Sequence, residues 1–141
     1  PLPSGGSAGE CLRSVRDSIH AGDRLPLNVG AAGHVISAFG DGGGAGYAKV
    51  RDDMHAVSFG ERDPEVAAVA CPVFGLNQRL AGALAVSGPR YRIEALGAKP
   101  ILRVLLKHAS QLTTAFGGNP EPFGSALAAL DRRPKRAARA K

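Results

Sequence analysis

Two apolar runs near the middle of the chain have the pattern of a buried β-hairpin. Residues 66–74 read VAAVACPVF and residues 80–87 read LAGALAVS, and the GLNQR between them suits a hairpin loop. Because neither run alternates with polar residues, we expect both strands to be covered on both faces, as in the centre of a sheet. Alternation over residues 55–59 predicts a further strand before the hairpin.

Helical periodicity is found on both sides of this hairpin. After it, residues 98–116 place their large apolar side chains on one stripe, which predicts a long amphipathic helix. Before it, the spacing predicts a short helix over residues 30–39, with Asn28 as its N-cap. A second short helix is expected at 47–54, and a last one at 122–131.

The amino-terminal residues carry weaker patterns. Imperfect alternation predicts strands at 10–16 and 18–20. Pro26 keeps the residue before it extended, so residues 24–27 are expected to form an edge strand or a strap, not a helix. The order of these elements predicts an α+β fold in which helices pack against an antiparallel sheet.

Length and charge narrow the class of protein. A chain of 141 residues suits one domain with a single core. The formal net charge of +6 suggests nucleic-acid binding, but all twelve Asp and Glu and twelve of the eighteen Lys and Arg lie in residues 1–131. The excess therefore lies in residues 132–141. We predict a folded domain at 1–131 and a basic carboxy-terminal tail, which is more often solvated than a binding arm.

The sequence carries no signal for a membrane span, a disulfide framework or a metal site. The longest charge-free stretch, residues 25–40, is too short and too polar to cross a bilayer. Cys11 and Cys71 have no paired spacing, and the four histidines have no metal-ligand spacing. We therefore expect no metal, no cofactor and a cytoplasmic location.

Cys71 is the candidate for enzymatic chemistry. A thiol beside a sheet can act as a nucleophile when a base such as His55 activates it. No glycine elbow surrounds this thiol and a proline follows it, so a small packed side chain is the other interpretation. The glycine cluster at 40–46 lacks the Lys-Ser/Thr of a phosphate loop, and we expect a turn there.

The start of the helix expected at 30–39 is the candidate binding site. Residues 29–33 have small side chains that leave the backbone accessible, and the first N–H groups of a helix are unpaired and partly positive. A carboxylate could dock there. Close packing of the helix on the sheet would also favour alanine and glycine, so spacing alone leaves both interpretations open.

Three motifs occur in order: GDRLPLNVGAAGHVISAF, VSFGERDPEVAAVACPVF and LAGALAVSGPRYRI. Over residues 22–117 they resemble the effector-binding, carboxy-terminal domain of the IclR family of bacterial transcription regulators. The resemblance implies a GAF/profilin-like sensor domain, not an enzyme, whose pocket takes a small organic acid. The ligand positions that it implies are Ala31, Ala32, Gly33, Ser58, Glu61, Ala68, Ala85 and Ser87.

The resemblance also implies partners and limits. Self-association as a dimer or tetramer is expected. Ala68 and Ala85 cannot form side-chain hydrogen bonds, which predicts a roomy pocket for an aromatic or larger aliphatic acid, and His55 is expected at its rim. No recognition-helix pattern precedes the first predicted strand, so we expect this chain to lack the family's winged helix-turn-helix and DNA binding to occur only through that domain. The alternatives are a cysteine-dependent enzyme and an oligomerisation module whose pocket is filled by side chains.

Overall fold

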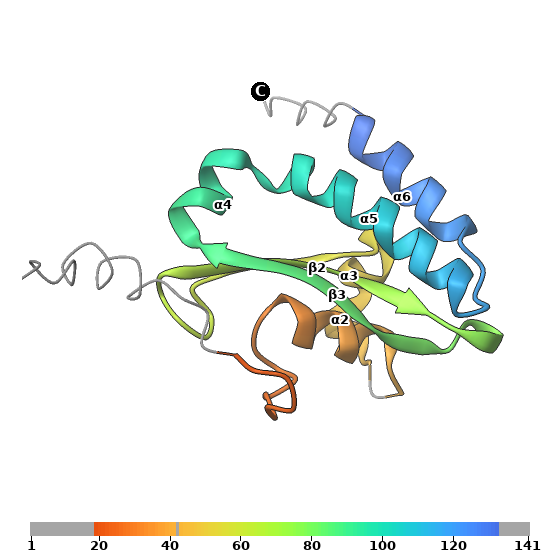
Figure 1. Cartoon of the computed structure of the whole chain (residues 1–141), viewed down its shortest axis with the longest axis horizontal. Helices are drawn as coiled ribbons and strands as arrows, with labels where there is room; N and C mark the ends of the chain where they lie inside the picture. The colour runs from red at the N-terminus through yellow and green to blue at the C-terminus, as the bar shows by residue number, and fades with distance from the viewer. Residues whose placement is uncertain (1–18, 42, 133–141) are drawn as a thin grey trace, which may run out of the picture.

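The structure is a computed structural model that describes residues 19–41 and 43–132. Within these residues, three antiparallel strands form one sheet in the order β1–β2–β3, and helices cover both of its faces (Figure 1). This confirms the predicted α+β class. The strands are β1 (Ala56–Phe59), β2 (Val66–Phe74) and β3 (Leu80–Pro89). The helices are α2 (Ala31–Phe39), η1 (Ala45–Tyr47), α3 (Ala48–Asp53), η2 (Leu76–Gln78), α4 (Arg90–Leu96), α5 (Ala98–Ala115) and α6 (Glu121–Asp131).

Some predictions concern the ends of the chain. The strand predicted at 10–16 and nearly all of the basic tail lie outside the described residues. Ile19 and His20 form no strand. Residues 24–26 form an extended strap without strand pairing, which confirms the strap alternative for this segment.

β2 is the central strand, and its side chains are buried on both faces. Val69, Cys71 and Val73 belong to a cluster with the leucines of α5. On the opposite face, Ala70 packs against Ala31 of α2, in a second cluster. Helices therefore cover both sides of this strand (Figure 1), as its unbroken apolar run predicts.

β3 differs from the prediction because it lies at the edge of the sheet. Among the described strands it pairs only with β2, and Val86 is 41% exposed. Half of its ten residues are alanine or glycine, which offer little apolar area for a neighbour to cover. An apolar run of small residues therefore does not distinguish an edge strand from a central one.

α5 confirms the strongest helical pattern. Its buried stripe, which includes Leu102, Leu105 and Leu106, faces β2, while Gly117 follows its end with φ +83°. α6 packs against α5 through Phe123, which is fully buried. α4 was not predicted, because Ile93 is its single buried residue and leaves no apolar period to detect.

The hairpin turn is fastened to the connection between α5 and α6. Gln78 Nε2 donates to the carbonyl of Asn119 at 3.0 Å, and the Asn119 amide donates to Gln78 Oε1 at 2.7 Å. Gly75 and Gly117 form an isolated β-bridge beside this pair. These contacts fix the turn end of the hairpin.

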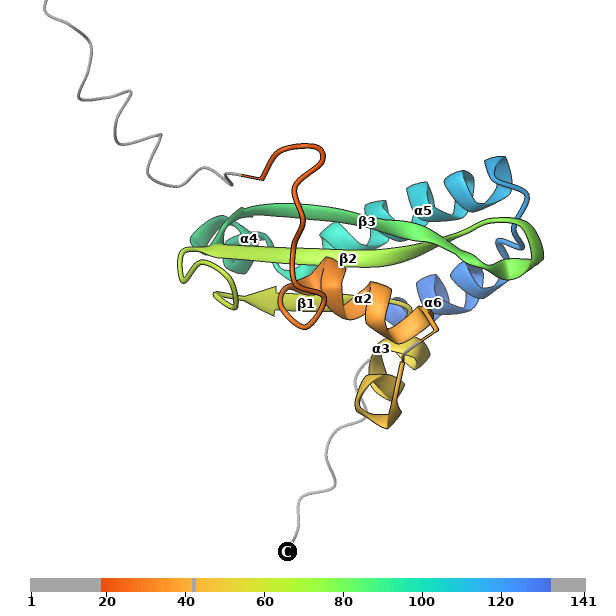
Figure 2. The same cartoon turned by 90° about the horizontal axis from the view of Figure 1, so that it is seen from below.

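The extended residues 24–26 continue through a turn at 27–30, and from here on the name strap means residues 24–30. The strap lies against α2, which it contacts through Leu27. Figure 2 shows this segment crossing the sheet on the α2 side and entering α2 directly. The N-cap of α2 is Gly30, with φ +86° and no side-chain cap, so the prediction of Asn28 as the cap is wrong. The chain turns at Gly30 with a positive φ, which glycine adopts without steric cost. An asparagine cap usually has a β-region backbone with negative φ, so it does not fit this turn.

Candidate ligand-binding site

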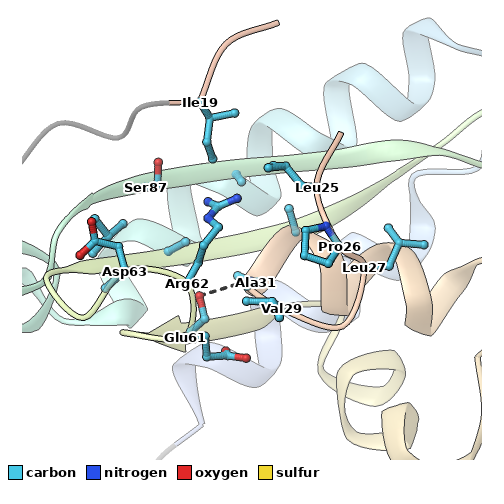
Figure 3. Close-up of a pocket in the computed structure, with 18 of the residues that line it drawn as sticks. Ile19, Leu25, Pro26, Leu27, Val29, Ala31, Glu61, Arg62, Asp63 and Ser87 are labelled. Carbon is cyan, nitrogen blue, oxygen red and sulfur yellow. Dashed lines mark hydrogen bonds between the residues drawn. The ribbon is translucent and has the colours of Figure 1, made fainter. Parts of the chain in front are cut away.

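A cavity of about 450 Å³ lies between the strap, the start of α2 and the neighbouring strand ends (Figure 3). Its volume falls in the range of small-molecule sites, about 300–1,000 Å³. All eight positions that the family resemblance implies line this one cavity: Ala31, Ala32, Gly33, Ser58, Glu61, Ala68, Ala85 and Ser87.

The sheet supplies the floor of the cavity through strand register. Ser58 pairs with Ala68, and Ala68 pairs with Ser87, so these three residues form one row across β1, β2 and β3. Ala70 and Ala85 are paired in the next row on the same face. The small side chains in these rows leave space beneath the start of α2, which explains why a cavity forms here.

The start of α2 is partly satisfied by the protein itself. The Ala31 amide donates to Ser58 Oγ at 3.1 Å, and Ser58 is only 6% exposed. The structure gives the amides of Ala32 and Gly33 no hydrogen-bond partner among the described residues. The expectation of unpaired amides therefore holds for Ala32 and Gly33, whereas Ala31 is already engaged.

Gly33 also has a packing role. A Cβ atom at this position would lie 2.6 Å from the backbone oxygen of Leu27, which is far inside contact distance. Ser37, one turn further along α2, donates its hydroxyl to the same Leu27 oxygen at 3.2 Å. The two interpretations left open by the sequence thus apply together, because close packing of the strap and accessible amides occur at the same turn.

Glu61 connects the loop between β1 and β2 to α2. Its Oε1 lies 2.7 Å from His34 Nε2; His34 is partly buried and Glu61 is exposed. Figure 3 shows the Glu61 side chain on the side of the loop away from Ser87. Glu61 is therefore a contact that positions the loop, although it also borders the cavity.

Several lining residues were not foreseen from the sequence. The strap contributes Leu25 and Pro26, and the β1–β2 loop contributes Arg62 and Asp63 (Figure 3). The GDRLPL segment does predict an extended strap. No local pattern shows that this strap crosses the sheet, however, because that is a tertiary contact.

His55 does not line this cavity, so its expected place at the rim is wrong. It directly precedes β1, and its Nδ1 lies 2.9 Å from the carbonyl oxygen of Asp53. This local contact holds the ring beside the end of α3, whereas the first β1 residue that lines the cavity is Ser58, three residues further on.

Cys71 lies in the core between β2 and α5. The thiol is fully buried and contacts the Leu105 carbonyl oxygen at 3.7 Å. Burial raises the pKa of the Cys71 thiol from 9.0 to about 12. A reactive cysteine needs an accessible thiolate, so Cys71 has the properties of a packed core residue and not of a nucleophile.

We expect Cys71 to resist alkylation in the folded protein. In a Cys11→Ser background, where Cys71 is the single thiol, labelling by iodoacetamide at about pH 8 should be slower than in urea by about a thousandfold or more, because the thiolate is suppressed. Intact mass spectrometry gives the rate. Equal rates in the folded and unfolded protein would restore Cys71 as a candidate nucleophile.

Neither a metal-binding cluster nor a membrane-spanning helix is found among the described residues. No group of three or more His, Cys, Asp or Glu side chains is arranged to hold a metal ion among them. None of the helices in this part of the chain is long and apolar enough to cross a membrane.

Comparison with known proteins places this geometry in a family. Residues 46–114 match the family model described as bacterial transcriptional regulator IclR C-terminal. No curated protein sequence matches the chain. Among solved structures, the transcriptional regulator YaiJ aligns with a TM-score of 0.65 at 22% identity, over 72% of this chain and 71% of that one.

In two other solved structures the match covers about half of the solved chain. The IclR transcriptional regulator from Alicyclobacillus acidocaldarius has a TM-score of 0.62 at 23% identity, over 73% of this chain and 51% of its own. HmgR from Pseudomonas aeruginosa has a TM-score of 0.57 at 26% identity, over 73% of this chain and 53% of its own. The chain thus spans about half the length of these two proteins. The family match and the shared fold together show that this chain is similar to the carboxy-terminal domains of the IclR family of bacterial transcriptional regulators.

Proposed function

We propose that this domain senses a small organic acid and passes the signal to the DNA-binding part of an intact regulator. The observation that supports the proposal is the convergence of the strap, α2 and all three strands on one cavity of about 450 Å³. A ligand in this cavity would contact elements that are far apart in the sequence, from Ile19 before the strap to Ser87 of β3. Binding would therefore be coupled to how these elements pack.

The lining favours an acid with a sizeable apolar part. Leu25, Pro26, Val29 and the alanines of the sheet form apolar walls, which suit an aromatic ring or an aliphatic chain. Hydroxyls and the helix-start amides supply polar contacts at one side. An aromatic or larger aliphatic carboxylate matches both features.

The signal needs only a modest energy difference. A coupling of about 1–3 kcal/mol between ligand binding and domain association changes the affinity for a second partner by roughly 5- to 150-fold.

We propose that the domain, ending at Asp131 where α6 ends, self-associates as a dimer or tetramer in the intact regulator. DNA binding would belong to another part of that protein.

The proposal predicts that small carboxylates stabilise the chain. In a panel of acetate, succinate, benzoate, phenylacetate and 4-hydroxybenzoate, we expect the aromatic acids to bind most tightly, with a Tm that rises with ligand concentration because the ligand binds the folded state. Thermal shift and isothermal titration calorimetry measure this. Ala85→Leu, which fills the cavity, should weaken binding by about tenfold or more.

The matched control is Ala81→Leu, on the same strand but outside this cavity. It should leave the affinity unchanged. If no acid in the panel produces heat or a Tm shift while circular dichroism shows a folded protein, the sensor proposal is wrong. The domain would then be better described as an oligomerisation module.

A further inference from the structure

Arg62 is the cavity residue whose charge is not neutralised within the described structure. It lies in the loop between β1 and β2, and Figure 3 shows its guanidinium pointing into the cavity toward β3. It has no ion pair or hydrogen bond with any described residue. A full positive charge beside apolar walls attracts an anion more strongly than it would in open solvent.

The acidic residues of the lining are each engaged by another group. Glu61 contacts His34 at 2.7 Å, and Asp63 Oδ1 accepts from the Glu65 amide at 2.9 Å. Asp23 Oδ2 accepts from the amide of His20 at 2.8 Å. These contacts hold the three carboxylates and leave the guanidinium of Arg62 available to a ligand.

The lining of the cavity holds more carboxylates than cations. Asp23, Glu61 and Asp63 line the cavity together with a single cation, because Arg62 is the sole Lys or Arg among the described lining residues. Without Arg62, three carboxylates would repel a negatively charged ligand. Recognition of an acid at this site therefore depends on this one side chain.

We infer that Arg62 binds the acidic group of the ligand and is the residue that makes the cavity select an anion over a neutral isostere. The inference rests on the proposed sensing function, but it moves the acidic group from the start of α2 to the β1–β2 loop. Two observations support that placement: the Ala31 amide is already bonded to Ser58, and the guanidinium of Arg62 points into the cavity. A guanidinium matches a carboxylate in a bidentate pair.

The test compares each acid of the panel with its primary amide, which has the same shape and no charge. Calorimetry with wild-type protein should show a preference for the tightest acid over its amide of about ten- to hundredfold, as expected for a charge-assisted contact. Arg62→Gln should abolish or invert this preference while still binding the amide, because the apolar walls remain. Arg62→Lys should keep part of it, since the charge remains without the bidentate fork.

Arg79→Gln is the matched control, because it removes one exposed positive charge at the opposite end of the hairpin. It should leave the acid-to-amide ratio unchanged, which separates a local contact from a change in overall charge. If Arg62→Gln and Arg62→Lys both keep the wild-type ratio, the inference fails and the sensing proposal stands. If wild-type protein binds no acid, both fail together.

Discussion

Replacing Phe123 with alanine is expected to lower the free energy of unfolding by about 3–5 kcal/mol, the usual cost of removing a buried aromatic ring and leaving a cavity. Phe123 is fully buried on α6, and its ring centroid lies 6.1 Å from that of Phe74 at the end of β2. Phe74 in turn packs edge-on against Phe39 of α2, at 5.4 Å. The three rings join helices from opposite faces of the sheet around one strand end.

Urea denaturation followed by circular dichroism measures this loss. Because small domains have a total stability of about 5–15 kcal/mol, the Phe123→Ala protein should be partly unfolded or close to it at 37 °C. Phe59→Ala serves as the control, since Phe59 is 43% exposed at the end of β1 and should lose about 1 kcal/mol or less. Equal losses for the two variants would show that α6 contributes little to the core.

Gly33→Ala is expected to damage both stability and ligand binding. In an ordinary helix this change stabilises by about 0.5–1 kcal/mol, because glycine loses more conformational freedom on folding. Here the new Cβ would lie 2.6 Å from the Leu27 oxygen and 3.0 Å from its carbonyl carbon, so the strap has to move. We expect a net destabilisation of about 1–3 kcal/mol, typical of overpacking.

Displacement of the strap also removes a wall of the cavity, so the affinity for the tightest acid of the panel should fall by about tenfold or more. The control is Gly124→Ala on α6, where a Cβ meets nothing within 4 Å. That variant should be stabilised by about 0.5–1 kcal/mol and bind as the wild type does. A stabilised Gly33→Ala protein with intact binding would contradict the close approach of Leu27 to α2.

The strongest patterns in the sequence predicted the elements that bury the most apolar surface. The unbroken apolar run of β2 predicts burial on both faces, and the long apolar period of α5 predicts one buried stripe, as the structure has them. β3 was assigned as a strand, but its edge position could not be read from a run of alanine and glycine. α4 has no apolar period, so it could not be recognised before the structure placed Ile93 in the core.

The candidate site was predictable only in part, and for a physical reason. The eight implied positions came from the family resemblance, and the structure explains their proximity through the register that aligns Ser58, Ala68 and Ser87. The pairing of His34 with Glu61 joins residues 27 positions apart. Neither this pair nor the direction of the Arg62 side chain follows from local spacing, since both depend on how the loop folds back toward α2.

The fastening of the hairpin turn to the α5–α6 connection has a consequence for how motion is distributed. Gln78 and Asn119 immobilise one end of β2 and β3, whereas Ser87 and the cavity lie toward the other end of β3. Local opening requires the least energy where the fewest contacts must break. A ligand bound in the cavity would therefore displace the strap and the β1–β2 loop, while the turn end of the hairpin stays in place. Such a displacement would move α2, which follows the strap directly, more than α6.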